Sequence, residues 1–188
     1  SLRAEAIALE NKLPVVRLVE SGGANLMHVG EVFIDGGRGF ANQARMSARG
    51  IPQVCVMHGH STAGGAYLPG MSDYVIMVRG RAKAFLAGPP LLKAATGEIA
   101  TDEELGGAEM HCSISGVAEY LAEDDADGIR IARDILARLP WNDRLPMRAV
   151  KTWKEPRYPV EQLAGVVPTD FRQPYDCLLY TSDAADDS

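Results

Sequence analysis

Short runs of apolar residues recur along the chain and define the expected strands. The four runs are Val15–Val19, Val54–Met57, Tyr74–Val78 and Ala84–Ala87. Each is too short for a helix and is apolar at successive positions, so we expect both faces of each strand to be buried. Strands of this kind are typical of a mostly parallel sheet.

Helix-like segments separate these runs. The pattern predicts helices at Leu2–Asn11, at Phe40–Arg49 with Gly50 as its cap, and at Thr62–Leu68. The alternation of buried strands with helices predicts the α/β class.

The chain changes character after its most regular helix. This helix should begin at Asp124 or Asp125 and stop at Pro140, because apolar residues recur between them with a 3.6-residue period. We therefore expect a compact domain over residues 1–140, followed by a linker over 141–176 toward a domain that is absent, with at most a short helix at Val160–Ala164. Residues 177–188 fit no preceding pattern, and we expect them to be disordered or foreign to the gene.

Composition narrows the class of protein. The 188 residues are 46% apolar, and 19 basic against 25 acidic residues give a net charge of −6 without any basic run, which argues against nucleic acid as the main partner. No apolar stretch approaches the ~20 residues of a membrane span, and the first residues lack the features of a secretory signal. Cys55, Cys112 and Cys177 are far apart and form no CxxC, so we expect reduced thiols, no structural zinc, and a location in the cytoplasm or a mitochondrial matrix.

The glycine pair Gly64-Gly65 follows the second apolar run, in a segment that Thr62 could cap. A glycine costs about 1 kcal/mol relative to alanine inside a helix, so two adjacent glycines need a reason. One reason is a site where free N–H groups of a helical first turn hold an anion or a carbonyl oxygen that gains negative charge. The other is tight packing against a neighbouring element, and both remain open.

A second glycine-rich loop, Ser21-Gly22-Gly23-Ala24-Asn25, directly follows the first apolar run. Open parallel sheets place their ligands at the carboxyl ends of their strands. Taken alone, the loop is more typical of a turn. Two such loops after consecutive strands together favour a binding site.

Other residues suggest alternative chemistry. His58 and His60 could share one face of a strand end, but no acidic third ligand stands nearby, so we interpret them as loop histidines. Ser61 lies in G-H-S-T-A, close to the nucleophile elbow G-x-S-x-G, so a serine hydrolase using His111 and Asp73 is retained as an alternative.

Basic residues could hold a polyphosphate ligand. Pro89-Pro90 should open a helix that carries Lys93, and the further candidates are Arg45, Arg81 and Lys83. The chain has no G-x-x-x-x-G-K-[ST] loop, and Gly37-Arg38-Gly39 fails the dinucleotide pattern at Asn42, so we expect neither ATP nor NAD to bind. Asp102–Glu104 should be the first turn of a helix ending at Gly106-Gly107.

Five ordered motifs carry a family resemblance. They are SGGANL, NQARMSARGIPQV, STAGGAYLPGMSDY, FLAGPPLLKAATGE and EELGGAEMHCSISGVAEY. Over roughly Leu2–Asp176 the chain resembles the carboxyltransferase β subunit of biotin-dependent acyl-CoA carboxylases. The resemblance implies a crotonase-like (ClpP/crotonase) fold, a spiral of ββα units, in an N-terminal acyl-CoA-binding carboxyltransferase domain.

The resemblance also implies a reaction and its site. A carboxyl group moves from carboxybiotin, carried by a biotin carboxylase/biotin carrier α subunit, to the carbon beside the thioester of an acyl-CoA. Gly64 and Gly65 are implied to hold the enolate oxygen by backbone N–H groups, and no metal is implied. The implied substrate-binding residues are Ser21, Gly22, Gly23, Ala24, Asn25, Thr62, Ala63, Ala66 and Lys93.

The resemblance leaves the acyl group open. Asn25 and the stretch Phe85–Pro90 are similar to the methylcrotonoyl or geranyl branch, whereas the loop Met27–Phe40 is shorter and richer in glycine than in methylcrotonoyl enzymes. Family members form homo-oligomers and continue for several hundred residues beyond Asp176, so we expect this chain alone to lack activity. A non-catalytic CoA-binding or assembly module is a third hypothesis.

Overall fold

The computed structural model describes residues 2–23, 26–141, 161, 168–170, 172 and 173. It separates into residues 1–146 and 147–188, and every helix and strand given below lies in the first unit. Apart from Glu161, the helix expected at Val160–Ala164 lies outside the described residues, as does the segment 177–188. In the described part, no helix combines the length and apolar character that crossing a membrane requires.

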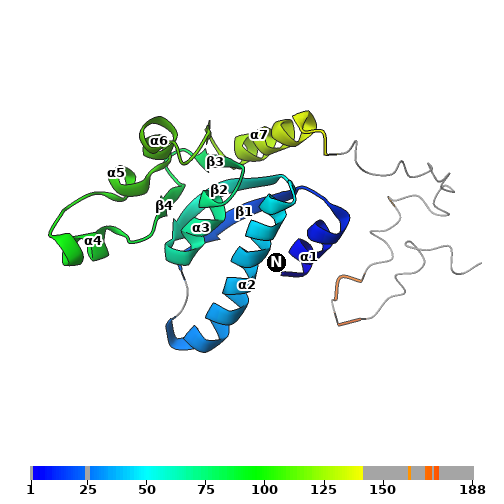
Figure 1. Ribbon diagram of the computed structural model, residues 1–188, viewed down its shortest axis with the longest axis horizontal. Helices are drawn as coiled ribbons and strands as arrows, with labels where there is room; N and C mark the ends of the chain where they lie inside the picture. Colours follow the sequence, from blue (N-terminus) through cyan, green and yellow to red (C-terminus); the bar gives the residue numbers. More distant parts are fainter. Residues whose placement is uncertain (1, 24–25, 142–160, 162–167, 171, 174–188) are drawn as a thin grey trace, which may run out of the picture. The chain divides into compact units, whose positions relative to one another are not determined.

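A parallel sheet organises the first unit (Figure 1). Its strands are β1 (Val15–Ser21), β2 (Gln53–Thr62), β3 (Tyr74–Val78), β4 (Lys83–Phe85) and β5 (Tyr120–Ala122). The order is β1-β2-β3-β5, and β4 pairs separately with the last residues of β2. All four pairings are parallel, which confirms the predicted α/β class and the four expected strands; β5 is an additional strand.

Helices cover both faces of this sheet. Gln53 on β2 bonds to α2 (Val29–Ala48), whereas Val56, three residues later and so on the opposite face, lies against Gly128 of α7 (Asp125–Arg138). The other helical segments are α1 (Leu2–Asn11), η1 (Leu26–His28), η2 (Ala63–Ala66), α3 (Tyr67–Gly70), α4 (Pro89–Thr96), α5 (Asp102–Gly106), α6 (Ala108–Met110) and η3 (His111–Ser115).

The predicted helix ends are confirmed where local chemistry sets them. The Asp124 side chain caps α7 by accepting a hydrogen bond from the N–H of Asp127 at 2.8 Å. The α4 helix begins at Pro89 and ends at Gly97, whose φ of +80° is a conformation that glycine adopts freely. The acidic start of α5 forms a capping box between Thr101 and Glu104.

Three expectations about local structure are wrong. The segment expected as a loop at Met27–Phe40 is mostly helical, because α2 begins at Val29 rather than at Phe40. The helix expected at Thr62–Leu68 is a 3₁₀ turn, η2, followed by α3, and Thr62 makes no side-chain cap. His58 and His60 belong to β2 and not to a loop.

The first strand is buried on one face only. Val16 is 40% exposed and Leu18 is 61% exposed, whereas Val19 is buried. The β1 strand lies at the edge of the sheet, so the expectation that both faces are covered is wrong for it. The main core lies farther in and is built on β2 and β3, including Val54, Val56, Ile76 and Val78.

Candidate active site

A pocket of about 910 Å³ opens between α1, β1, α2 and the turn that follows β2. It is lined mainly by apolar side chains and glycines. The lining residues used below are Glu5, Arg17, Ser21, Gly22, Gly23, Gly36, Gly37, Gly39, Phe40, Ala63, Gly64, Gly65 and Leu68. The pocket therefore contains both glycine-rich segments that the sequence singled out.

The turn after β2 places the glycine pair on the pocket wall. Thr62 ends the strand in an extended conformation, and Ala63 then adopts a φ of +54°, which is uncommon for a residue with a Cβ. Gly64 and Gly65 follow within η2. The first N–H groups of a helical turn have no acceptor within that turn, so this segment presents backbone donors without using a side chain.

The two glycines have different surroundings. A Cβ on Gly65 would lie 3.2 Å from both Cβ and Oγ of Ser21 and 3.4 Å from Oγ of Ser61, so Gly65 allows these side chains to pack closely against the turn. A Cβ on Gly64 would meet only the ring of Phe40, at 3.8 Å. Packing therefore accounts for Gly65, whereas Gly64 faces open space in the pocket.

The loop after β1 lies beside this turn. Ser21 and Ser61 are register partners in the β1–β2 ladder, and a Cβ on Gly23 would lie 3.9 Å from the carbonyl oxygen of Thr62. The N–H of Gly23, whose φ is +97°, donates to Oγ of Ser21 at 3.3 Å. The structure thus brings Ser21, Gly22 and Gly23 to the glycine turn, while Ala24 and Asn25 lie outside the described residues.

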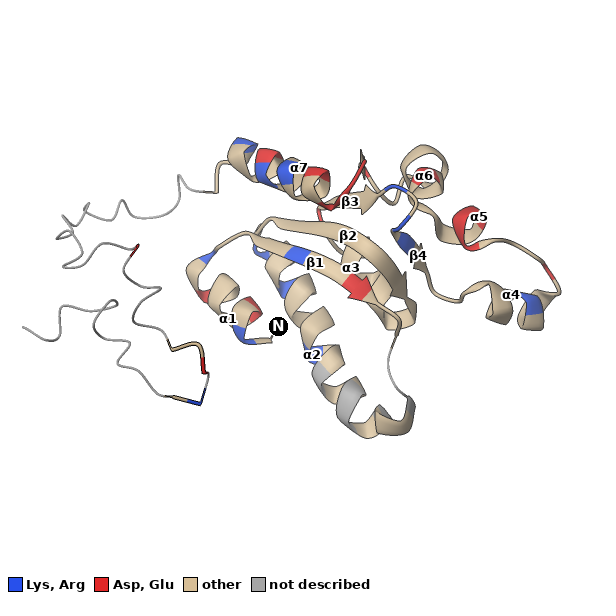
Figure 2. Ribbon diagram, turned by 180° about the vertical axis from the view of Figure 1, so that it is seen from behind, with Lys and Arg blue, Asp and Glu red and all other residues tan. Residues whose placement is uncertain are grey.

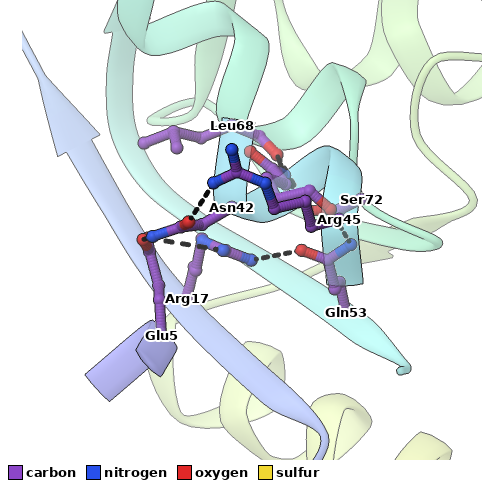
Figure 3. Close-up of polar contacts among 8 residues, drawn as sticks. Glu5, Arg17, Asn42, Arg45, Gln53, Leu68 and Ser72 are labelled. Carbon is purple, nitrogen blue, oxygen red and sulfur yellow. Dashed lines mark hydrogen bonds and ion pairs between the residues drawn. The ribbon is translucent and has the colours of Figure 1, made fainter. Parts of the chain in front are cut away.

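A partly buried polar network, drawn in Figure 3, adjoins the pocket. Arg17 Nη1 donates to Oε1 of Gln53 at 3.0 Å, and Arg17 Nη2 lies 3.6 Å from Oε1 of Glu5. Asn42 Nδ2 donates to Glu5 Oε2 at 3.2 Å, and Asn42 Oδ1 accepts from Arg45 Nη1 at 3.0 Å. Glu5 and Arg17 were not predicted as site residues, although a charge within the apolar run Val15–Val19 was a signal for Arg17.

Three of the basic residues considered as ligands of a polyphosphate lie outside the pocket lining. Lys93 is exposed on α4 and does not line the pocket. Arg81 forms an ion pair with Asp125 at 2.5 Å, and Lys83 forms one with Glu103 at 2.7 Å. The structure therefore does not gather these side chains at the pocket.

The two histidines have separate neighbours. His58 Nδ1 lies 2.7 Å from Oδ1 of Asp125, and this hydrogen bond is the main reason why the pKa of Asp125 is lowered. The ring of His60 contacts the edge of the Phe85 ring. Within the described ranges, no three His, Cys, Asp or Glu side chains are placed to share a metal ion.

The hydrolase alternative is not favoured by the geometry. Ser61 is fully buried and donates from Oγ to the carbonyl oxygen of Gly65 at 2.9 Å. His111 uses one ring nitrogen on the carbonyl oxygen of Ala84 and the other on Ser115, and Asp73 accepts from the N–H of Gln53. Ser61, His111 and Asp73 thus bond to other partners and are not arranged as the nucleophile, base and orienting acid of a catalytic triad.

The arrangement suits stabilisation of a negatively charged oxygen. Backbone donors that are fixed before the reaction act strongly in an apolar, water-poor site, because little reorganisation is needed when charge develops. A thioester whose carbonyl reaches Gly64 would keep its acyl chain against the apolar lining. Burial also raises the pKa of the nearby Cys55 thiol to about 12, so this residue supplies no thiolate at neutral pH.

Comparison with known proteins identifies the family. A family model described as the carboxyl transferase domain matches residues 1–188. The crystal structure of the β subunit of Pseudomonas aeruginosa geranyl-CoA carboxylase has 66% sequence identity and a TM-score of 0.71, with 93% of this chain and 32% of that chain covered.

Two curated relatives agree with this match, and the match to each of them covers 93% of this chain. A "Probable biotin-dependent acyl-coenzyme A carboxylase beta2 subunit" of Mycobacterium tuberculosis is 57% identical, with 33% of its own length covered. The mitochondrial methylcrotonoyl-CoA carboxylase beta chain of Dictyostelium discoideum is 51% identical, with 30% covered. The chain spans about a third of the length of these relatives. It has the crotonase-like fold of their family and belongs to the carboxyl transferase domain family.

Proposed function

We propose that the complete protein is the carboxyltransferase β subunit of a biotin-dependent acyl-CoA carboxylase, and that this chain contains its acyl-CoA half-site. The observation that carries the proposal is the glycine turn on the wall of the apolar pocket. The 66% identity to a geranyl-CoA carboxylase β subunit supports the same conclusion.

The chemistry follows from what a thioester requires. Removal of a proton from the carbon beside the carbonyl or, in an α,β-unsaturated thioester such as geranyl-CoA, from the γ carbon conjugated with it, gives an enolate, and negative charge develops on its oxygen. Backbone N–H groups at Gly64 and Gly65 would bind that oxygen more strongly in the transition state than in the substrate, which is what accelerates the step. Carboxybiotin on a partner subunit supplies the carboxyl group, and the turn's part is to hold the acceptor.

The pocket favours an acyl group that is long rather than short. Gly36, Gly37 and Gly39 of α2 line it, and a Cβ at each of them would meet no atom within 4 Å. Missing side chains on a helix that faces a pocket leave room for a ligand. Geranyl-CoA is therefore the proposed substrate, ahead of 3-methylcrotonoyl-CoA.

Partners and location follow from the same family. We expect a biotin-carrying α subunit, assembly of several β subunits, and a location in the cytoplasm, or in the mitochondrial matrix in a eukaryote, as the name of the Dictyostelium relative states for that protein.

The test is carboxylation of a panel of acyl-CoAs by the full-length protein with its biotinylated partner, bicarbonate and ATP. We expect turnover, with geranyl-CoA preferred. Preference for propionyl- or acetyl-CoA would retain the reaction and reject the acyl assignment. No carboxylation of any thioester by an assembled complex would reject the carboxyltransferase function.

The glycine turn has its own variant. Gly64→Val should reduce turnover roughly 100-fold or more, because the added side chain occupies the site of the thioester, and it should leave assembly intact. Gly70→Ala is the matched control, since a Cβ there meets no atom within 4 Å and Gly70 does not line the pocket. Loss of assembly with unchanged turnover per assembled site would instead favour a non-catalytic assembly module.

A further inference from the structure

Two buried polar side chains hold the glycine turn from opposite ends. The first is Ser61, the residue before Thr62, which is fully buried. Its hydroxyl donates to the carbonyl oxygen of Gly65 at 2.9 Å. This bond fixes the orientation of the peptide group that follows Gly65.

The second is Gln43, which is also fully buried. It projects from α2, and its Nε2 donates to the carbonyl oxygen of Leu68 at 2.8 Å, three residues beyond Gly65. Ser72 Oγ donates to the same carbonyl oxygen at 2.8 Å. The segment from Gly65 to Leu68 is thus bonded at both ends to side chains that solvent does not reach.

The backbone of this segment needs such support. Ala63 is in the left-handed region, with a φ of +54°, which is unfavourable for a residue with a Cβ. Two adjacent glycines follow, and glycine restricts the backbone less than any other residue. A turn with these properties adopts one geometry only when its surroundings impose it.

The backbone of Gln43 is bonded to the polar network that adjoins the pocket. Gln53 Nε2 donates to the backbone carbonyl oxygen of Gln43 at 3.1 Å, and Gln53 Oε1 accepts from Arg17 at 3.0 Å. Arg17 and Glu5 both line the pocket. Arg17 on the pocket wall is therefore connected to the glycine turn through Gln53 and Gln43.

We propose that Ser61 and Gln43 are positioning residues that set the geometry of the Gly64–Gly65 donors toward the substrate's carbonyl oxygen. The inference rests on the proposed function. It gives Ser61 a role in which its hydroxyl donates to the backbone and does not react.

The test uses the full-length protein in complex with its partner and the variants Ser61→Ala and Gln43→Met, which remove the hydrogen bonds and keep similar volumes. We expect kcat to fall by about 10- to 100-fold, since a displacement of about 1 Å at a reacting group has effects of this size. KM for acyl-CoA should change less than about threefold. The infrared band of a ¹³C-labelled thioester carbonyl should shift less on binding than in the wild type, because fewer or longer hydrogen bonds reach it.

Controls separate positioning from a loss of stability. Ser113→Ala removes a hydroxyl-to-carbonyl bond over the same four-residue spacing, outside the pocket. Ile51→Val shortens a buried side chain next to α2 without removing a hydrogen bond. Both should leave kcat and the carbonyl band unchanged.

Amide hydrogen exchange tests the inference independently of catalysis. Exchange at residues 64–66 should be faster in Ser61→Ala and Gln43→Met than in the wild type and the controls. Unchanged exchange, or an unchanged kcat and carbonyl band in both variants, would overturn the positioning role. A wild-type complex that carboxylates no thioester would instead overturn the proposed function, with the exchange result still deciding whether the two residues hold the turn.

Discussion

Glycines around the pocket meet different physical needs. Gly23 has a φ of +97°, which a side chain would strain. A Cβ on Gly65 would require the side chains of two serines to shift by a few tenths of an ångström, whereas a Cβ on Gly37 would meet no atom within 4 Å. Substitutions at these three positions should therefore impair the site for different reasons, namely backbone strain at Gly23, close contact at Gly65 and occupation of the pocket at Gly37.

Gly37→Leu is the variant that tests the acyl assignment. The new side chain would project into the pocket and displace the long acyl chain. Turnover of geranyl-CoA should therefore fall by about 100-fold, which is the usual effect of a displaced reacting group, while turnover of 3-methylcrotonoyl-CoA should stay within about fivefold of the wild type. Steady-state kinetics with both substrates measure the change in preference. Gly30→Leu, on the same helix but outside the pocket lining, should change neither rate; equal losses with both substrates in Gly37→Leu would contradict the assignment.

At the scale of elements, the sequence predicted what depends on local chemistry. The cap of α7, the acidic first turn of α5, the proline start of α4 and the strands at Val54–Met57 and Tyr74–Val78 follow from residues close in sequence. The start of α2 did not, because four glycines, at about 1 kcal/mol each relative to alanine, outweigh the local helical pattern. The contacts of α2 with α1 and with Leu68 come from Asn42 and Gln43 in its second half, and contacts between segments so far apart are not visible in a single sequence.

The candidate site likewise has features that the local sequence predicts and features that depend on distant contacts. The two glycine-rich segments could be predicted, because each directly follows an apolar run. The contact of Gln43 with Leu68 joins residues 25 apart, and that of Arg17 with Gln53 joins residues 36 apart, so no local pattern indicates them. The three-residue strand β5 was missed because its pairing with β3 defines it more than its composition does.

The α7 helix provides the pH-dependent prediction. Acidic and basic residues follow one another along it (Figure 2), and Asp125 in its first turn bonds to His58 of β2. Because this bond lowers the pKa of Asp125, the carboxylate stabilises the fold above the pKa of an unfolded aspartate, about 3.9, and this contribution is lost as pH falls through the lowered value. Asp125→Asn should therefore reduce the free energy of unfolding at pH 7 and have a diminishing effect toward pH 3.

Urea unfolding at a series of pH values measures that difference. Asp134→Asn is the matched control on the same helix, since Asp134 pairs with the exposed Arg130. Exposed pairs of this kind contribute little to stability, so the control should lie close to the wild type. An Asp125→Asn effect of the same size at pH 7 and pH 3 would contradict the role of the carboxylate.

At the scale of the whole molecule, this chain is about a third of its relatives' length. The pocket and the glycine turn lie within the described part, so we expect the proposed acyl-CoA half-site not to require the remaining sequence. We expect the 188-residue chain to bind acyl-CoA in a calorimetric titration.

The same chain should not carboxylate acyl-CoA when supplied with the biotinylated partner, bicarbonate and ATP, because the site for the biotin group is expected in the part that it lacks. The full-length protein assayed in parallel is the control. Incorporation of labelled bicarbonate by the 188-residue chain would show that the half-site assignment is wrong.

The β2 strand pairs with β1, β3 and β4, and each pairing is parallel. Parallel partners cannot form as a hairpin, so each ladder must wait until segments distant in sequence have met, which makes such sheets slow to fold. The glycine turn begins where β2 ends and has little regular structure of its own. We therefore expect the geometry of this turn to be among the last features acquired during folding, so that a nascent chain would present the proposed acyl-CoA half-site only once the central sheet is complete.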